Sequence, residues 1–383
     1  MNRMLFVAPC HFGLEAVLKR EIYDLGYEIT KVEDGRVTFE GDAEALCRAN
    51  LSLRTAERVL LLVGEFHAET WDELFEGIRA LPWEVYLPKD ARFWVKKAAS
   101  VRSKLFSPSD IQSIGKKAMV ERLKSAYHLD WFPEDGKDYP VRIFLRNDEV
   151  MVTLDTSGDS LHKRGYRTLH GLAPISETLA AALIMLTPWR EGRILVDPFC
   201  GSGTFLIEAA MMAAQIAPGL QRSFTAMDWE HLVPKQLWED CRKEAREMIL
   251  IPKESDLQGY DIDGAVLKAA RANAKAAGVE RMIHFQERAV KDLSHPKKYG
   301  FVISNPPYGE RMEEKRDLPV LYGQIADALD RLDTWSSYFI TSYEDTEKYL
   351  RRKAQKKRKI YNGMLRTDFY MFPGPKPPRK EKN

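Results

Sequence analysis

The sequence predicts an α/β protein whose C-terminal part is a doubly wound, mostly parallel sheet and whose N-terminal part is α+β. The main observation is that short apolar segments alternate with helical segments from residue 193 onward, which is typical of parallel sheets with crossover helices. Asn362-Gly363 separates two strand-like runs near the C-terminus and predicts an antiparallel closing hairpin. The first 64 residues show a different order, β-α-β-β-α-β.

The segment 1–64 is expected to form a ferredoxin-like unit. Asp34-Gly35 lies between two strand-like runs and predicts a hairpin. The expected strands are 4–8, 28–33, 36–40 and 58–63, and the expected helices are 11–26 and 43–56. This fold alone implies no function.

The segment 65–160 is expected to form a second α+β unit. Asn147-Asp148 predicts a hairpin here as well. The expected helices are 71–80 and 110–128, and the expected strands are 92–99, 141–146 and 149–155. Residues 157–176 have the composition of a linker that leads into the last domain.

The segment 161–383 is expected to form the doubly wound domain. Pro174 is expected to open its first helix, because proline suits a first turn. The expected strands are 193–197, 257–260, 282–286, 301–304, 335–341, 357–361 and 366–372; the expected helices are 175–186, 204–216, 265–277 and 318–332, with a further helix, 234–249, in an insertion at 221–252. Such sheets bind ligands at the carboxyl ends of their strands.

A glycine turn follows the first strand of this domain. The strand ends in Asp197, and Gly201-Ser202-Gly203 leads directly into a helix. Glycines let a ligand approach the backbone, and the unpaired N–H groups of a helix start suit a carboxylate. The turn lacks the third glycine of a dinucleotide fingerprint and the Gly-Lys-Thr/Ser ending of a P-loop, so a polyphosphate is not favoured. A small zwitterion that is linked to adenosine fits better as a ligand. The alternative is that the turn binds no ligand and is an ordinary first crossover of a parallel sheet.

A second motif, Asn305-Pro306-Pro307-Tyr308, follows about a hundred residues after Asp197-Pro198-Phe199-Cys200-Gly201-Ser202-Gly203-Thr204. The pair resembles the S-adenosylmethionine-dependent methyltransferases that modify exocyclic amino groups of bases. The longer run 305–311 resembles the bacterial guanine-N2 methyltransferases of ribosomal RNA, which carry an N-terminal THUMP RNA-binding module. The resemblance covers nearly the whole chain. It implies a Rossmann-like methyltransferase domain at 161–383, a THUMP module at 65–160 and S-adenosyl-L-methionine as cofactor.

Cofactor contacts are expected at the strand ends. Asp261 ends the second strand and is expected to bind the ribose hydroxyls. Asp263 is the alternative, although it suits the N-cap of the next helix. Asp197 either binds the amino group of the cofactor or only braces the turn. The other expected contacts are Ile175, Thr178, Gly201, Gly203, Thr204, Phe205, Ile262 and Ala289.

The adenine contact has no obvious residue. Ala289 occupies the position after the third strand where relatives commonly place an acid. The backbone of Ala289, the side chain of Glu287 or Asp292, or shape alone is expected to hold the adenine.

Asn305, Pro306 and Tyr308 are the expected catalytic residues. The lone pair of an aromatic amine is delocalised, so methyl transfer requires the nitrogen to rehybridise. The side-chain oxygen of Asn305 and the carbonyl of Pro306 can accept its two N–H groups, and Tyr308 can stack on the base. Cys200 is read as a small turn residue, because the sequence places no base beside it. A base within a helix would have to be flipped out, at a cost of a few kcal/mol.

Basic side chains are the expected RNA contacts, because their charge gives sequence-independent affinity for phosphates. For each of them the alternative is an ordinary solvated charge. The run 351–359 holds seven basic residues in nine and no acid. The expected contacts are Lys96, Lys97, Arg102, Lys104, Lys163, Arg164, Arg311, Lys356 and Lys357.

Composition limits the functional classes. The net charge is +2, so contact with a polyanion requires local patches. The four cysteines are scattered, which argues against zinc and disulfides and for a reducing compartment. No apolar run is long enough to span a membrane. We therefore expect a cytoplasmic protein with no metal, no membrane contact and no obligate protein partner.

Four functions remain open from the sequence. The first is guanine-N2 methylation of 23S ribosomal RNA, and the second is the same chemistry on transfer RNA. The third is methylation of adenine N6, which the Asn-Pro-Pro-Tyr motif alone does not exclude. The fourth is a non-catalytic RNA-binding assembly factor.

Overall fold

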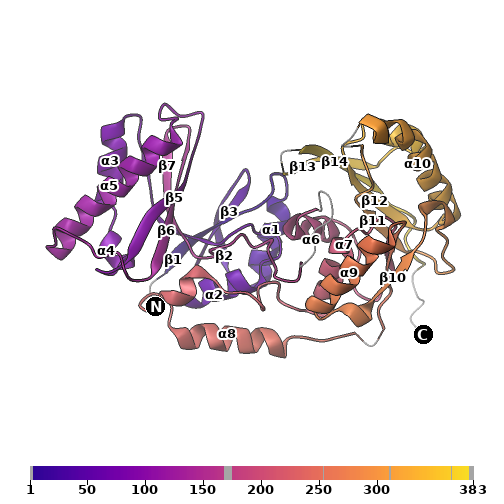
Figure 1. Cartoon of the computed structure of the whole chain (residues 1–383), viewed down its shortest axis with the longest axis horizontal. Helices are drawn as coiled ribbons and strands as arrows, with labels where there is room; N and C mark the ends of the chain where they lie inside the picture. The colour runs from indigo at the N-terminus through magenta and orange to yellow at the C-terminus, as the bar shows by residue number, and fades with distance from the viewer. Residues whose placement is uncertain (1–2, 168–174, 253, 310–311, 364, 379–383) are drawn as a thin grey trace. The chain divides into compact units, whose positions relative to one another are not determined.

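The computed structural model describes residues 3–167, 175–252, 254–309, 312–363 and 365–378 (Figure 1). The chain forms two compact units that are discontinuous in sequence. The first contains residues 1–10, 19–161 and 222–244, and the second contains 11–18, 162–221 and 245–383. Residues 222–244, which lie in the expected insertion 221–252, therefore belong to the first unit. The sequence instead predicts three domains that are each continuous in the chain. In the described part of the chain, no helix is both long and apolar enough to cross a membrane.

The first unit contains one seven-stranded sheet in the order β2-β3-β1-β4-β7-β6-β5 (Figure 1). The central strand, β4 (Leu60–His67), pairs antiparallel with both β1 and β7, so one sheet continues through the expected ferredoxin-like and THUMP segments. Strand β4 is longer than the expected strand 58–63 and extends beyond residue 64, with a register shift between Leu62 and Gly64. The strands are β1 (Met4–Pro9), β2 (Glu28–Glu33), β3 (Arg36–Gly41), β4 (Leu60–His67), β5 (Arg92–Val101), β6 (Asp138–Arg146) and β7 (Glu149–Asp155).

Local capping signals set the helix ends in this part of the chain. Thr70 and Glu73 form a capping box at the start of α3 (Trp71–Ala80). Ser107 caps α5 (Pro108–Tyr127), which has proline in its first turn and ends at His128 with φ +56°. The helices α3 and α5 pack against each other, and α5 packs on β5. The remaining helices are α1 (Glu15–Asp24), α2 (Ala43–Ser52), α4 (Trp83–Tyr86) and α8 (Lys235–Glu247).

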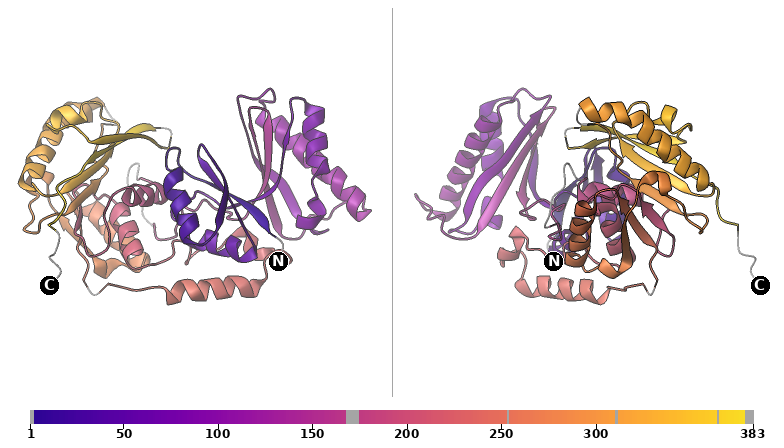
Figure 2. Two further views of the ribbon diagram at one scale, coloured as in Figure 1. Left: turned by 180° about the vertical axis from the view of Figure 1, so that it is seen from behind. Right: turned by 45° about the vertical axis from the view of Figure 1, so that its right-hand side comes forward.

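The second unit contains the expected doubly wound sheet, in the order β10-β9-β8-β11-β12-β14-β13 (Figures 1 and 2). The first five strands are parallel, and β14 runs antiparallel to both β12 and β13. The fold class predicted from the sequence is confirmed. The strands are β8 (Leu195–Asp197), β9 (Leu257–Asp261), β10 (Ile283–Glu287), β11 (Phe301–Ser304), β12 (Ser336–Thr341), β13 (Lys356–Asn362) and β14 (Leu365–Phe372).

Both faces of this sheet are buried, as alternate residues of β8 show. Leu195 belongs to the core beneath α6 (Glu177–Met185), α7 (Thr204–Ala213) and α9 (Gly264–Ala276). Its neighbour Val196 belongs to the core on the opposite face, with α10. Strands that are apolar on both faces are therefore required here, which explains the short, continuously apolar segments seen in the sequence.

One helix begins earlier than expected. The sequence predicts a helix over 318–332; instead α10 (Met312–Arg331) starts six residues earlier, with Pro319 inside it. An interior proline removes a backbone hydrogen bond, but Leu318 and Tyr322 are buried beside it in the core. This packing stabilises the helix through the proline. A short helix, α11 (Thr346–Tyr349), precedes the closing hairpin.

Candidate active site

The glycine turn between β8 and α7 is tightly packed. Gly203 has φ +85° and is the N-cap of α7. A Cβ at this position would lie 3.1 Å from Cζ of Phe285 and 3.3 Å from Cβ of Ala270. Gly201 has φ +51°, with open space around the position of its Cβ. Only glycine fits this turn without strain, and the turn leaves backbone N–H groups near the start of α7 open to a ligand.

Asp261, at the end of β9, braces this turn. Its Oδ2 accepts a hydrogen bond from the N–H of Gly201 at 3.0 Å, and its Oδ1 accepts one from the N–H of Asp263 at 3.1 Å. The carboxylate is only partly buried, so lone pairs remain for a ligand. Asp263 caps α9 by accepting from the N–H of Ala265 at 2.8 Å, as its position in the sequence predicts.

Asp197, at the end of β8, is buried and links the turn to β11. Its Oδ1 accepts a hydrogen bond from the hydroxyl of Ser304 at 2.5 Å and another from the N–H of Phe199 at 3.1 Å. Burial raises the pKa of Asp197 to about 7, although both hydrogen bonds oppose the shift. Asp197 therefore braces the turn, and binding of the cofactor's amino group by this residue stays a prediction.

Asn305 follows directly after Ser304 and presents a buried acceptor. Its Oδ1 is buried, and no described residue donates a hydrogen bond to it. An unsatisfied buried acceptor costs about 1–3 kcal/mol, so the site is suited to a ligand that brings an N–H donor. Pro306 is buried next to Asn305, and Tyr308 is half-buried. The hydroxyl of Tyr322 donates to the carbonyl of Pro307 at 3.4 Å and supports this loop from α10.

The ends of β8, β9 and β11 bring these groups to one edge of the sheet. The three strands are parallel neighbours, with Asp197 opposite Gly259 and Val196 opposite Val302. Asp261 and Asn305 therefore flank the glycine turn on either side. This arrangement fits an adenosine-type cofactor in the turn and an amine beside Asn305, at the edge where such sheets bind ligands.

Arg167 joins three parts of this region and was not predicted from the sequence. Its Nη2 donates to the carbonyl of Ile175 and to Oγ1 of Thr204, each at 2.9 Å. Its Nε lies 2.9 Å from a carboxylate oxygen of Glu177. Arg167 thus fixes the segment before α6 to the first residue of α7.

Several expected cofactor contacts point into the core. The side chains of Ile175, Thr178, Thr204 and Phe205 are all buried, so Ile175 and Phe205 have mainly backbone groups to offer a ligand. Ile262 is instead 74% exposed, directly after Asp261. Ala289 is half-buried, while Glu287 and Asp292 are exposed. Burial raises the pKa of the Cys200 thiol well above its usual range, which agrees with a turn residue rather than a nucleophile.

The prediction that Arg164 contacts RNA is wrong. Its side chain is only 2% exposed, and its Nε lies 3.4 Å from Oε1 of Glu208 in α7. The hydroxyl of Tyr166 donates to the same oxygen at 3.1 Å. Glu208 would otherwise be a buried charge without a partner, so this arginine is held inside the domain. Its neighbour Lys163 is exposed.

The remaining expected RNA contacts divide into three groups. Lys97, Arg102 and Lys356 are exposed. Lys96 donates to the carbonyl of Gly158 at 3.3 Å, Lys104 forms an ion pair with Glu69, and Lys357 forms one with Glu347. Arg311 lies outside the described residues.

The basic run 351–359 is less free than its composition indicates. Arg351 contacts Asp327 at 2.5 Å and Asp330 at 3.1 Å, and Arg352 contacts Asp330 at 2.7 Å. These acids come from α10 and cannot be paired with the run by sequence alone. Three of the seven basic residues, Arg351, Arg352 and Lys357, are therefore paired with acids.

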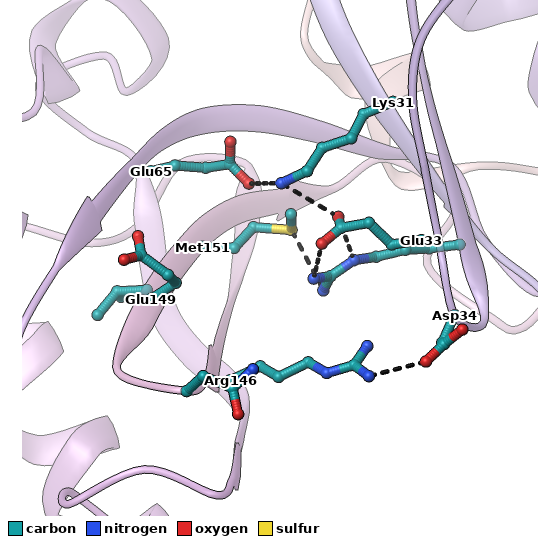
Figure 3. Close-up of a pocket in the computed structure, with 10 residues that line it drawn as sticks. Lys31, Glu33, Asp34, Glu65, Arg146, Glu149 and Met151 are labelled. Carbon is teal, nitrogen blue, oxygen red and sulfur yellow. Dashed lines mark hydrogen bonds and ion pairs between the residues drawn. The ribbon is translucent and has the colours of Figure 1, made fainter.

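A charged hollow in the first unit has a different character. It has a volume of about 410 Å³ and lies between the β2–β3 hairpin and strands β4, β6 and β7 (Figure 3). Its charges are largely paired with one another: Lys31 with Glu33 at 3.3 Å and with Glu65 at 3.8 Å, and Arg146 with Asp34 at 2.8 Å. It holds none of the methyl-transfer motifs. No cluster of metal-binding side chains occurs among the residues that the structure describes.

Comparison with known proteins agrees with this geometry. Residues 164–370, more than half of the chain, match the family described as "RMKL-like, methyltransferase domain". The chain belongs to the RMKL-like methyltransferase family. It is therefore an S-adenosylmethionine-dependent methyltransferase. Residues 5–60 match the RlmL ferredoxin-like domain and residues 68–155 match the THUMP domain, an RNA-binding module.

Two relatives illustrate the RMKL-like family. The chain is 46% identical to the "Putative RNA methyltransferase YpsC" of Bacillus subtilis, over 100% of this chain and 99% of that protein. It is 34% identical to the "Ribosomal RNA large subunit methyltransferase K/L" of Cellvibrio japonicus, over 96% of this chain. The match spans only 51% of that longer protein.

Solved structures share the same architecture. "SMU.472, a putative methyltransferase complexed with SAH" is 42% identical with a TM-score of 0.93, over 99% of this chain and 100% of that one. A "predicted N6-adenine-specific DNA methylase from Listeria monocytogenes" is 45% identical with a TM-score of 0.92, over 98% of this chain and 97% of that one.

Proposed function

We propose that this RMKL-like methyltransferase transfers a methyl group to the exocyclic N2 of a guanine in 23S ribosomal RNA. The observation that carries the proposal is the buried, unpartnered Oδ1 of Asn305 beside the glycine turn. The run 305–311 supports guanine N2, and the name of the Cellvibrio relative supports ribosomal RNA.

The proposed chemistry depends on two acceptors. Oδ1 of Asn305 and the carbonyl of Pro306 accept the two N–H groups of the target amine, which favours a nitrogen with a localised lone pair. S-adenosylmethionine, when bound, supplies an electrophilic methyl group on a sulfonium. Tyr308 stacks on the base and holds the amine in line with that group. The proton leaves after the transfer, so no strong base is needed.

The cofactor-binding residues follow from the geometry of the turn. The N–H groups of Thr204 and Phe205, at the start of α7, are suited to the carboxylate of the cofactor. Asp261 has lone pairs left for the ribose hydroxyls, and the exposed Ile262 offers an apolar surface for the adenine. The backbone of Ala289 is the remaining candidate for the adenine amino group.

Nucleoside analysis tests the proposal directly. The protein is incubated with labelled S-adenosylmethionine and separated cellular RNAs from cells that lack it, and the RNA is digested to nucleosides. We expect label in N2-methylguanosine from large-subunit ribosomal RNA. Label in transfer RNA would show that transfer RNA is the substrate instead. No label in any RNA would contradict the proposal.

Adenine N6 is the second candidate for the target atom. The name of the Listeria relative favours it, and Asn-Pro-Pro-Tyr can accept the amine of adenine in the same way. The same digest distinguishes the two, because N6-methyladenosine and N2-methylguanosine separate chromatographically.

A further inference from the structure

Phe106 is an apolar side chain that the fold leaves in solvent. It lies in the loop between β5 and α5, and its side chain is 80% exposed, more than any other large apolar side chain in the described part of the chain. The preceding residue, Leu105, is 4% exposed and anchors the loop in the core. The exposure of Phe106 is therefore a property of an ordered loop and not of a chain end.

The loop that carries Phe106 is held by several hydrogen bonds. Ser100 Oγ donates to the carbonyl of Leu105 at 2.6 Å. Oδ1 of Asp148, in the β6–β7 turn, accepts from the N–H of Lys104 at 2.7 Å, and the N–H of Asp148 donates to Oγ of Ser103 at 2.9 Å. A ring presented on such a loop loses little conformational freedom on binding, which favours affinity.

The same loop contains a strained residue. Arg102 has φ +53°, and the facing turn residues Asn147 and Asp148 have φ +53° and +65°. Asn and Asp tolerate this region, but arginine does not favour it. Strain of this kind persists only where the surroundings impose it, and it is enriched at functional sites.

An exposed cation lies in the same loop as the ring. Arg102 stands four positions before Phe106, and no acid in the described part of the chain pairs with it. An aromatic ring with an unpaired cation in the same loop matches a nucleic-acid strand, whose bases stack and whose phosphates are negative. It does not match a protein partner, for which a broader apolar surface would be needed.

We propose that Phe106 is a stacking platform for an unpaired base of the RNA substrate, with Arg102 of the same loop contacting a neighbouring phosphate. This inference rests on the proposed function, because it takes RNA as the substrate. Stacking tolerates any base, since every base has a π face. The platform would therefore select single-stranded RNA over a duplex, without selecting a sequence.

The test measures binding of a fluorescein-labelled single-stranded RNA, and of a duplex of equal length, by anisotropy at several salt concentrations. We expect Phe106→Ala to weaken single-strand binding about ten-fold. The slope of log affinity against log salt should not change, because no phosphate contact is lost. Phe106→Trp should bind like the wild type, since it keeps a ring.

Two further variants complete the design. Trp131 is 74% exposed elsewhere in the same unit, so Trp131→Ala is the matched control and should leave binding unchanged. Arg102→Ala should reduce the slope of log affinity against log salt by about the amount expected for one phosphate contact. Equal binding by Phe106→Ala and the wild type, or an equal loss on single strand and duplex, would overturn the platform. Neither of these outcomes would contradict the proposed function, which is tested separately by whether the wild type methylates RNA.

Discussion

The hydroxyl of Ser304 donates a 2.5 Å hydrogen bond to Oδ1 of Asp197, and both side chains are buried. The two residues end neighbouring parallel strands, β11 and β8. Asp197 opens the glycine turn, and Ser304 precedes Asn305. This single contact therefore connects the cofactor turn to the proposed catalytic loop.

The pH dependence of stability tests the buried state of Asp197. Its pKa is raised from 3.8 to about 7, so between these values the folded protein keeps a proton that the unfolded chain has released. This stabilisation is complete below the unfolded pKa and is lost as the pH rises through about 7. We expect the free energy of unfolding of the wild type to fall relative to Asp197→Asn across this window. Urea titrations at a series of pH values measure the difference, and a difference independent of pH would contradict the prediction.

Ser304→Ala is the companion variant. The hydrogen bond from Ser304 lowers the pKa of Asp197, so its removal should move the upper end of that window to higher pH. The same titrations detect the shift. An unchanged window would mean that the bond does not act on the carboxyl.

Arg167 is predicted to position the cofactor site. Removing its hydrogen bonds to Ile175 and Thr204 with Arg167→Gln should weaken binding of S-adenosylhomocysteine about ten-fold or more, because hydrogen bonds to charged groups contribute about 1.5–3 kcal/mol. Arg167→Lys should recover part of the affinity, since lysine keeps the positive charge but lacks the planar set of N–H donors of the guanidinium group. Calorimetry measures the affinity, and the KM for the cofactor should rise more than kcat falls.

The control for Arg167 is Arg193→Gln. Arg193 is also partly buried, donates to the carbonyl of Tyr299 and lies over the ring of Phe301, near the start of β8 and away from its carboxyl end. Its loss should lower stability without changing cofactor affinity at a temperature where the protein is folded. Equal effects of the two variants on affinity would assign Arg167 a merely structural role.

Gly203→Ala should disturb the turn through backbone strain and through steric overlap of the added Cβ. The position has φ +85°, which costs about 1–3 kcal/mol for a residue with a Cβ, and that Cβ would press on Phe285 and Ala270. Gly278 has φ +75° with no atom within 4 Å, so Gly278→Ala carries the strain alone. We expect Gly203→Ala to lower both stability and cofactor affinity, and Gly278→Ala to lower only stability. Thermal unfolding and calorimetry separate the two effects.

Features encoded locally could be predicted from the sequence. The alternating apolar and helical segments predicted the sheet, and Asn362-Gly363 predicted its closing hairpin. The glycine turn and Asn-Pro-Pro-Tyr predicted the edge of the sheet where the candidate site lies. Asp263 was identified as an N-cap because capping depends only on the next few residues.

Features that depend on distant partners could not be predicted. Arg164 looked like a surface cation because its partner, Glu208, lies 44 positions further along the chain. The bond between Ser304 and Asp197 spans 107 positions. Phe106 gave no signal, since an apolar residue in a sequence is ordinarily expected to be buried.

The central claim is that Asn305 holds the target amine while the cofactor binds independently in the glycine turn. Asn305→Ala, assayed by calorimetry with S-adenosylhomocysteine and by methyl transfer to RNA, tests it most directly. We predict an unchanged affinity for S-adenosylhomocysteine and a fall in kcat of about 100-fold or more, comparable to the loss of one preorganised group at a transition state. Methyl transfer at the wild-type rate would contradict the claim.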